Sequence, residues 1–323
     1  MNKGGSIFKY ILKKLLFMIP MLIIISFLIF MALQFMPVDP INYLLPPDAA
    51  QSEALKESLR EAYGLNDPVI VQYGRWILNI LKGDFGYSIT NGQQISTILA
   101  QKLPATLEIA ITALIISSVL GILLGILSAV NQNGVIDNIG RVIGVVGQSI
   151  PQFLFGIILI DVFALKLGIF PVGGRNLYGA ATFGDKLHNM FLPSIALSLG
   201  MIATVLRYTR NSMLDVMNKE YIKTARSKGV PEWKVYLKHA FRNSIGPIMV
   251  TILLRIPGLI GGSVVIESVF NWPGIGSTLM GAVTSGDYPI IMVITLLIAT
   301  VMLVVSFMVD VLSAILDPRI RLD

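Results

Sequence analysis

The sequence contains no cysteine among its 323 residues and only two histidines, His188 and His239. Without cysteine the chain can form no disulfide, carry no thiol nucleophile and hold no thiolate-bound metal. Charge is also scarce, because Asp, Glu, Lys and Arg make up 14% of the residues, against roughly 25% in a typical soluble domain. The sequence further lacks the Gly-rich loop ending in Lys-Ser/Thr that cradles nucleotide phosphates. These absences exclude disulfide-stabilised secreted proteins, thiol enzymes and nucleotide hydrolases built on that loop.

The chain has instead a series of long apolar runs. Hydrophobic residues make up 54% of it, and its mean hydropathy is +0.74. A helix of roughly 20 apolar residues crosses the hydrocarbon core of a bilayer. We therefore predict an all-α polytopic membrane protein whose six transmembrane helices span about 15–35, 109–130, 142–165, 191–206, 245–266 and 290–315. Basic residues precede the first run with no small-residue cleavage site, so we expect an uncleaved first span.

The positive charge is concentrated between the fourth and fifth predicted spans. Residues 207–242 hold nine Lys and Arg against three acids, which accounts for the formal net charge of +6. Short basic loops stay on the cytoplasmic side of a membrane. We therefore place this segment and both termini in the cytoplasm, and we interpret the charge as a topology signal rather than a nucleic-acid surface.

The longest segment between predicted spans, 37–104, is expected to form a small external helical domain. Apolar residues recur at helical spacing from Ser52 to Tyr63, and a second helix is predicted from about Val69 to Leu81. The predicted organisation is thus 1–36 (cytoplasmic N-terminus and first span), 37–104 (external domain) and 105–323 (five-helix core with cytoplasmic helices at about 211–243).

Within the basic segment, two short amphipathic helices flank the sequence Gly229-Val230-Pro231. Glycine adopts the positive φ that ends a helix, and proline is suited to the first turn of the next. Such a pair can lie on anionic lipid or insert into a soluble partner. The periodicity alone leaves both interpretations open.

Ionisable residues within the predicted spans are Asp161, Arg255 and Asp310. Each charge costs at least about 2.5–3.5 kcal/mol at membrane depth, so we expect Asp161 and Arg255 to pair directly or through water. The same charges keep an ion-coupled secondary transporter open as an alternative. A membrane protease is disfavoured because topology places the two histidines on opposite sides of the membrane. In the third span, residues 148–152 combine polar side chains with the helix breaker Pro151, which suits either helix–helix hydrogen bonding or a gate.

The helix pair resembles the cytoplasmic motif of ABC importer permeases, in the version carried by peptide and nickel permeases. The general motif reads Glu-Ala-Ala, three residues, Gly, then a hydrophobic-Leu-Pro element. Here Lys223-Thr224-Ala225 stand for the first three residues and Gly229 for the glycine. The Leu-Pro element is absent, and His239–Arg242 lie near its place, as is typical of the peptide-permease branch.

Six further blocks are similar to that family and occur in its order. One departs from the pattern, with Val38 where glycine is usual. The blocks are Met36–Pro40, Tyr63–Pro68 with Gln72-Tyr73, Gly83–Ser88, Pro104–Glu108, Val269–Gly276 with Asp287–Pro289, and Leu316–Arg321.

The resemblance implies the type I ABC importer permease fold and the role of the first of two permease subunits in a peptide importer. A nickel or other small-solute permease of the same family is the alternative. Implied partners are a second permease, two cytoplasmic ABC ATPases that bind ATP and Mg²⁺, an external substrate-binding protein with its peptide, and membrane lipid in a bacterial or archaeal cell membrane. No cofactor is implied for this chain, which is not expected to be an enzyme.

Two sets of candidate site residues follow. The implied ATPase-docking residues are Glu220, Thr224, Ala225, Gly229 and Trp233. The candidate pathway or gate residues are Ser149, Pro151, Gln152, Asp161, Arg255, Trp272, Pro273 and Gly274.

Overall fold

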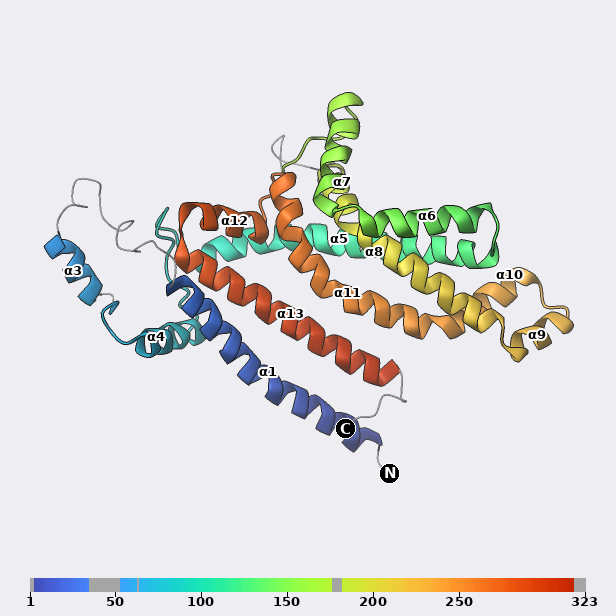
Figure 1. Ribbon diagram of the computed structural model, residues 1–323, viewed down its shortest axis with the longest axis horizontal. Helices are drawn as coiled ribbons and strands as arrows, with labels where there is room; N and C mark the ends of the chain where they lie inside the picture. The colour runs from blue at the N-terminus through green and yellow to red at the C-terminus, as the bar shows by residue number, and fades with distance from the viewer. Residues whose placement is uncertain (1–2, 35–52, 63, 176–181, 317–323) are drawn as a thin grey trace.

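The computed structural model describes residues 3–34, 53–62, 64–175 and 182–316, which are almost entirely helical (Figure 1). Within these described residues, five helices are long and apolar enough to cross a membrane. They are α1 (Lys3–Gln34), α5 (Ile95–Val130), α8 (Phe183–Met217), α11 (Arg242–Val269) and α13 (Tyr288–Leu316). The shorter elements are α3 (Glu53–Ala62), α4 (Val69–Leu81), α6 (Val135–Ser149), α7 (Gln152–Leu159), η1 (Ile160–Lys166), α9 (Glu220–Ser227), α10 (Glu232–Lys234), η2 (Val235–Phe241) and α12 (Ile275–Ser285). The family-like blocks at 36–40 and 317–321 lie outside the described residues.

The predicted third span is not one straight helix. It divides into α6 and the continuous α7–η1 segment, which meet at an angle of 106°. The cause is Pro151, which disfavours helical geometry in the residue before it, and Ile150 is accordingly extended (φ −83°, ψ 123°). Figure 1 shows α7 rising away from the bundle while α6 lies along α5 and α8.

The predicted fourth span was too short at both ends. Helix α8 begins at Phe183, where Thr182 and Asp185 form a reciprocal capping box, and it continues to Met217. Arg207 and Arg210 were expected in a loop but belong to this helix. We call residues 207–242 the basic end of the bundle, and the end at α12 the opposite end.

Helices α5 and α8 form the centre of the bundle because glycine lets their backbones approach. A Cβ on Gly121 would lie 2.6 Å from Cβ of Val205, and one on Gly125 would lie 2.5 Å from Cβ of Thr209. Gly121 and Gly125 form a Gly-x-x-x-Gly motif, and both glycines lie at this helix contact. In the second such pair, Gly144 faces open space, so only the first motif works as a packing motif.

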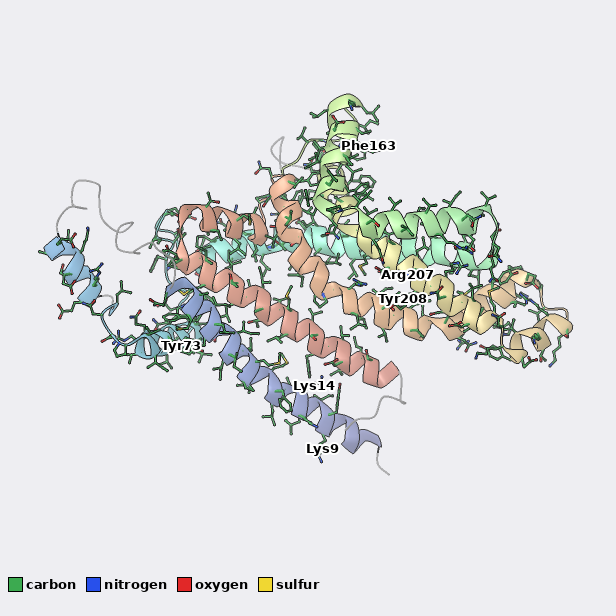
Figure 2. The ribbon with its side chains drawn as sticks, viewed as in Figure 1. Lys9, Lys14, Tyr73, Phe163, Arg207 and Tyr208 are labelled. Atoms are coloured by element: carbon green, nitrogen blue, oxygen red, sulfur yellow. The ribbon has the colours of Figure 1, made fainter. Side chains whose placement is uncertain are left out.

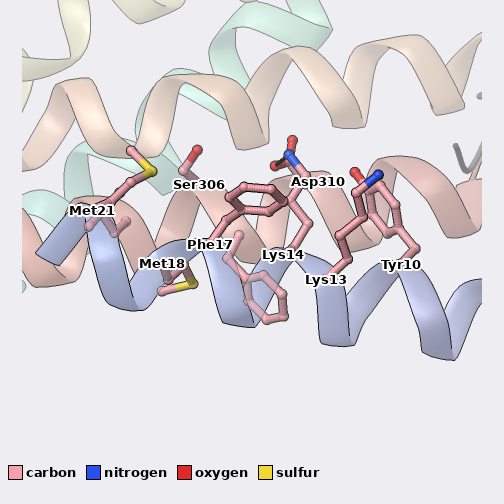
Figure 3. A pocket seen from close by; sticks show the side chains of 10 residues that line it. Tyr10, Lys13, Lys14, Phe17, Met18, Met21, Ser306 and Asp310 are labelled. Carbon is pink, nitrogen blue, oxygen red and sulfur yellow. Dashed lines mark hydrogen bonds and ion pairs between the residues drawn. The ribbon is translucent and has the colours of Figure 1, made fainter.

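Helices α1 and α13 form an outer layer that packs side by side (Figure 1). Lys14 Nζ lies 2.6 Å from Asp310 Oδ2, and this ion pair joins the two helices (Figure 3). Because each charge neutralises the other, both can lie in the apolar layer. Asp310, one of the three ionisable residues noted within the predicted spans, thus holds two spans together through its partner on α1.

The two helices predicted in the 37–104 segment are present. Helix α4 spans the predicted residues 69–81 and lies beside α1, where Tyr73 Oη is 2.8 Å from Ser26 Oγ and stacks edge-on against Phe27 (Figure 2). Helix α5, however, begins at Ile95, about ten residues before the expected boundary. The last part of this segment is therefore continuous with the membrane core.

A buried carboxylate anchors the loop after α4 to the start of α13. Asp287 is fully buried and accepts hydrogen bonds from the hydroxyls of Ser88 (2.5 Å) and Thr90 (2.7 Å). Backbone N–H groups of Ile89 and Thr90 also point to it. Two family-like blocks, 83–88 and 287–289, thus meet in space.

A second buried carboxylate, Asp137 on α6, holds the basic end together. Its side chain is 0% exposed and accepts two hydrogen bonds from Arg210 on α8, at 2.5 and 2.8 Å. Arg141 donates at 2.8 Å, Ser128 on α5 at 2.7 Å, and the backbone N–H of Asn133 at 2.9 Å. One carboxylate therefore joins α5, α6 and α8.

We predict that Gly121→Ala destabilises the bundle, because its new methyl group would overlap Val205. Overpacking of this kind costs about 1–3 kcal/mol. Thermal unfolding of the purified protein in detergent measures the effect. Gly144→Ala is the matched control and should leave the midpoint unchanged or raise it slightly. Equal midpoints for the two variants would show that α5 and α8 do not approach as closely as described.

We also predict that Asp137→Asn lowers stability strongly, because it leaves the guanidinium of Arg210 buried without its counter-ion. Loss of one partner from such a pair costs about 3–5 kcal/mol. The double variant Asp137→Asn with Arg210→Gln should lose less than the sum of the two single losses. Asp215→Asn, an exposed acid near the end of α8, serves as the control. Additive losses would contradict the pairing.

Candidate functional site

The predicted helix pair at the basic end is present. Helix α9 ends at Ser227 and is followed by Gly229, whose φ is +74°. The N–H of Val230 donates to the carbonyl of Ala225 at 3.2 Å, which closes the turn. Pro231 then precedes α10 with φ −56°. Glycine adopts this left-handed conformation without steric strain because it has no Cβ. The turn therefore has the geometry that the sequence predicted.

The second helix of the pair is continuous with the bundle rather than separate. Helix α10 runs through the π-helical segment η2 into α11 without a break, so residues 232–269 form one helical path. On the other side, two residues separate α8 from α9. A displacement of the helix pair is therefore transmitted directly to α8 and α11.

The inner face of the pair is anchored by a small apolar core. Ile222 on α9 and Val235 and Ala240 on η2 are fully buried against Met213 of α8 and Ala129 of α5. Burial of this apolar area stabilises the contact. Of the predicted docking residues, Ala225 belongs to this inner face and is buried.

The outer face of the pair is open in this chain. The other predicted docking residues, Glu220, Thr224, Gly229 and Trp233, are exposed, and Trp233 is 62% exposed. An Arg226–Glu232 ion pair (3.0 Å) spans the turn, and its hydrogen bonds raise the pKa of Arg226. The turn is therefore stabilised by the apolar core on its inner face and by the ion pair that spans it. Its outer face leaves polar groups and the indole ring of Trp233 exposed.

The break in the third span lies on a polar groove of about 450 Å³ between α6, α8 and α11. Pro151, Gln152 and Arg255 line it, together with Gln148, Thr204 and Arg207. Gln152 donates to the carbonyl of Leu197 at 3.2 Å, and Gln148 donates to the hydroxyl of Thr204 at 3.2 Å. Ser149 lies next to this groove, along a neighbouring hollow on α6 and α8.

The expected pairing of Asp161 with Arg255 is wrong. Asp161 forms an ion pair with Lys166 at 2.6 Å, within the same η1 segment. The bend at Pro151 turns η1 away from α6, so Asp161 is not among the residues that line the groove with Arg255. The two charges belong to different parts of the molecule.

The loop of Trp272, Pro273 and Gly274 lies at the opposite end of the bundle, and these residues do not line the groove. The indole N–H of Trp272 donates to the carbonyl of Ala105 at 2.8 Å, and the ring is 1% exposed. A Cβ on Gly274 would lie 2.4 Å from the carboxyl carbon of Glu267, so only glycine fits there. This loop is a structural clamp between α11, α12 and α5.

Glu267 is the buried centre of this clamp, and sequence reasoning assigned it no role. It accepts from the hydroxyl of Thr106 at 2.7 Å and from the N–H of Ser277 at 3.0 Å. Nearby, Arg175 forms a two-pronged ion pair with Glu108 (2.8 and 2.5 Å). The available signal was that blocks 104–108 and 269–276 both resemble family motifs, and Thr106 of the first block contacts Glu267.

Comparison with protein families gives two matches that together cover most of the chain. Residues 121–322 match the binding-protein-dependent transport system inner membrane component, and residues 7–110 match the N-terminal component of the same transport systems.

Two curated relatives match nearly the whole chain. The oligopeptide transport system permease protein AppB of Bacillus subtilis (strain 168) is 40% identical over 314 residues, covering 97% of this chain and 99% of the relative. The glutathione transport system permease protein GsiC of Salmonella typhimurium (strain LT2) is 37% identical over 313 residues, covering 97% and 98%.

A solved structure of similar fold is an inward-facing form of the MetNI methionine ABC transporter. The TM-score is 0.56 at 15% identity, and the match covers 69% of this chain and 97% of that one. An amino acid ABC transporter has a similar score of 0.53. These matches, together with the polytopic helical fold, show that the chain belongs to the binding-protein-dependent transport system inner membrane component family. It is a transmembrane permease subunit of an ABC importer rather than an enzyme.

Proposed function

We propose that this chain is the first of two permease subunits of a peptide importer, and that ATP hydrolysed by two partner ATPases drives transport. The main support for coupling between the ATPases and transport is the structure of the Gly229 turn. Its inner face is fixed to α5 and α8 through Ile222 and Val235, and its outer face is exposed. A partner that grips the outer face would move a rigid element rather than a loop.

The two helices joined to that element also flank the polar groove. Helix α8 contributes Arg207 and Thr204, and α11 contributes Arg255. Because no long loop separates them from α8 and α11, movement of α9 and α10 would directly change the shape of the groove. This supports alternating access in which the groove forms part of the pathway shared with the second permease subunit. Pro151 and Gln152 would lie at the wall where the third span bends.

The proposed orientation places the basic end and both termini in the cytoplasm of a bacterial or archaeal cell. Its support is the charge of residues 207–242, since short basic loops stay inside, and α1 begins and α13 ends toward that side (Figure 1). The segment that contains α3 and α4, before α5 begins at Ile95, would then lie on the external side, where a substrate-binding protein would deliver its cargo.

Peptide cargo is supported by the relatives, whose names specify oligopeptide and glutathione transport. A nickel complex or another small solute is the alternative within this family. ATP and Mg²⁺ would be bound by the ATPase subunits, because this chain has no phosphate-binding loop. An ion-coupled transporter is less well supported, since Asp161 and Asp310 are each neutralised by a lysine.

We predict that Gly229→Val weakens association with the ATPase subunits roughly tenfold, because a β-branched residue is strained at φ +74°. The measurement is co-purification of ATPases with the permease pair from detergent. Gly229→Asn is the matched control, because asparagine tolerates the left-handed region and no atom lies within 4 Å of a Cβ placed there. Normal assembly and transport by the valine variant would show that this turn is not the docking element.

We also predict that uptake depends on ATP and is independent of ion gradients. Proteoliposomes that contain the full complex and its binding protein should import peptide in the presence of a protonophore or without sodium, and should stop without ATP. This chain reconstituted alone should import nothing. Gradient-driven uptake by this chain alone would replace the ABC assignment with a secondary transporter.

A further inference from the structure

Among the described residues that line it, the polar groove at the third-span bend has two arginines and no acid. Arg207 projects from α8 and Arg255 from α11, and the other described lining residues are uncharged. Figure 2 shows Arg207 on α8, where that helix passes close to α11. A groove of about 450 Å³ can admit part of a small peptide.

Neither arginine has an anionic partner among the residues that the structure describes. Arg255 makes no hydrogen bond or ion pair there, and the only described interaction of the Arg207 guanidinium is with the ring of its neighbour Tyr208, 5.9 Å away. Two neighbouring arginines differ, because Arg141 and Arg210 are both bonded to Asp137. The two groove arginines thus retain their full set of hydrogen-bond donors.

The position of Arg255 makes this lack of a partner significant. It lies halfway along α11, a helix within a candidate membrane span. A charge at that depth is costly unless it faces water or meets an opposite charge. Placing a second cation in the same groove adds repulsion, which an anion bound in the groove would remove. The groove is therefore electrostatically complementary to an anion.

The shape of the donors indicates which anion. Guanidinium groups present parallel N–H donors that match the two oxygens of a carboxylate. Gln148 and Gln152 lie beside them and already have partners within the chain, which fixes the wall of the groove. We propose that Arg255 and Arg207 bind the carboxylate of the transported solute in this groove as it crosses the membrane, an inference that rests on the peptide-importer function proposed above.

The test compares two peptides of identical sequence, one with a free C-terminal carboxylate and one with a C-terminal amide. Uptake is measured in proteoliposomes with the full complex, at concentrations of each peptide that saturate the binding protein. The variants are Arg255→Gln, Arg255→Lys and Arg207→Gln. Lys9→Gln on α1 removes the same charge away from the groove (Figure 2) and is the matched control.

We expect Arg255→Gln to slow uptake of the acid peptide at least about tenfold, the loss typical of one charge-assisted hydrogen bond, and to leave uptake of the amide near its original rate. Arg207→Gln should act in the same direction, Arg255→Lys should retain part of the preference, and Lys9→Gln should retain all of it. An equal loss for both peptides, or an unchanged ratio, would overturn the proposal. Loss of the second permease from the purified complex in Arg255→Gln alone would also overturn it, because Arg255 would then pair with an acid of that subunit.

A direct measurement separates this inference from the proposed function. Binding of the acid and amide peptides to the detergent-purified complex, without ATP or the binding protein, reports on the groove alone. Stronger binding of the acid form that Arg255→Gln abolishes supports the groove even where uptake proves not to be ATP-driven. Equal binding of the two forms by the unaltered complex counts against the groove even where ATP-driven uptake is intact.

Discussion

The basic end of this protein depends on one buried charge, the carboxylate of Asp137. Its burial is favourable only because Arg210, Arg141 and Ser128 supply hydrogen bonds from three directions, since an unpaired carboxylate would be strongly disfavoured there. The hydrogen bonds to this carboxylate come from α5, α6 and α8, and they hold the three helices together. The helix pair around Gly229 packs on that assembly, so the rigidity of the proposed coupling element follows from this charge.

The same arrangement gives the permease a short mechanical path. An external force on α9 or α10 meets a buried apolar core centred on Ile222 and Val235 rather than a loose loop. The force then continues into α8 and α11 along the helices themselves. At the opposite end, Glu267 and Asp287 fix the loops between α5, α11, α12 and α13. A bundle clamped at both ends can rock as a unit, while the bend at Pro151 leaves its middle open to a polar groove.

Local sequence signals predicted the helices well but not their tertiary relations. The span positions and the Gly229 turn depend on periodicity and backbone freedom, which are properties of neighbouring residues. The Asp161–Arg255 pairing failed because it assumed a straight third span, whereas Pro151 redirected the chain by 106°. Arg207 was assigned to a loop because its charge resembled a boundary signal, although burial of its neighbours Val205 and Leu206 keeps α8 helical there.

The family-like blocks have a physical explanation in the structure, since those far apart in sequence meet as pairs. The hydroxyl of Thr106 accepts a hydrogen bond from the N–H of Ile275 and donates one to Glu267. The carbonyl of Ala105 accepts a hydrogen bond from the indole N–H of Trp272. Each contact requires a particular donor or acceptor on both sides, so a change in one block would leave a buried polar group unsatisfied in the other. These blocks hold the end of the bundle together and line no part of the arginine groove. Residues that distinguish one solute from another are therefore expected on the groove walls rather than within these blocks.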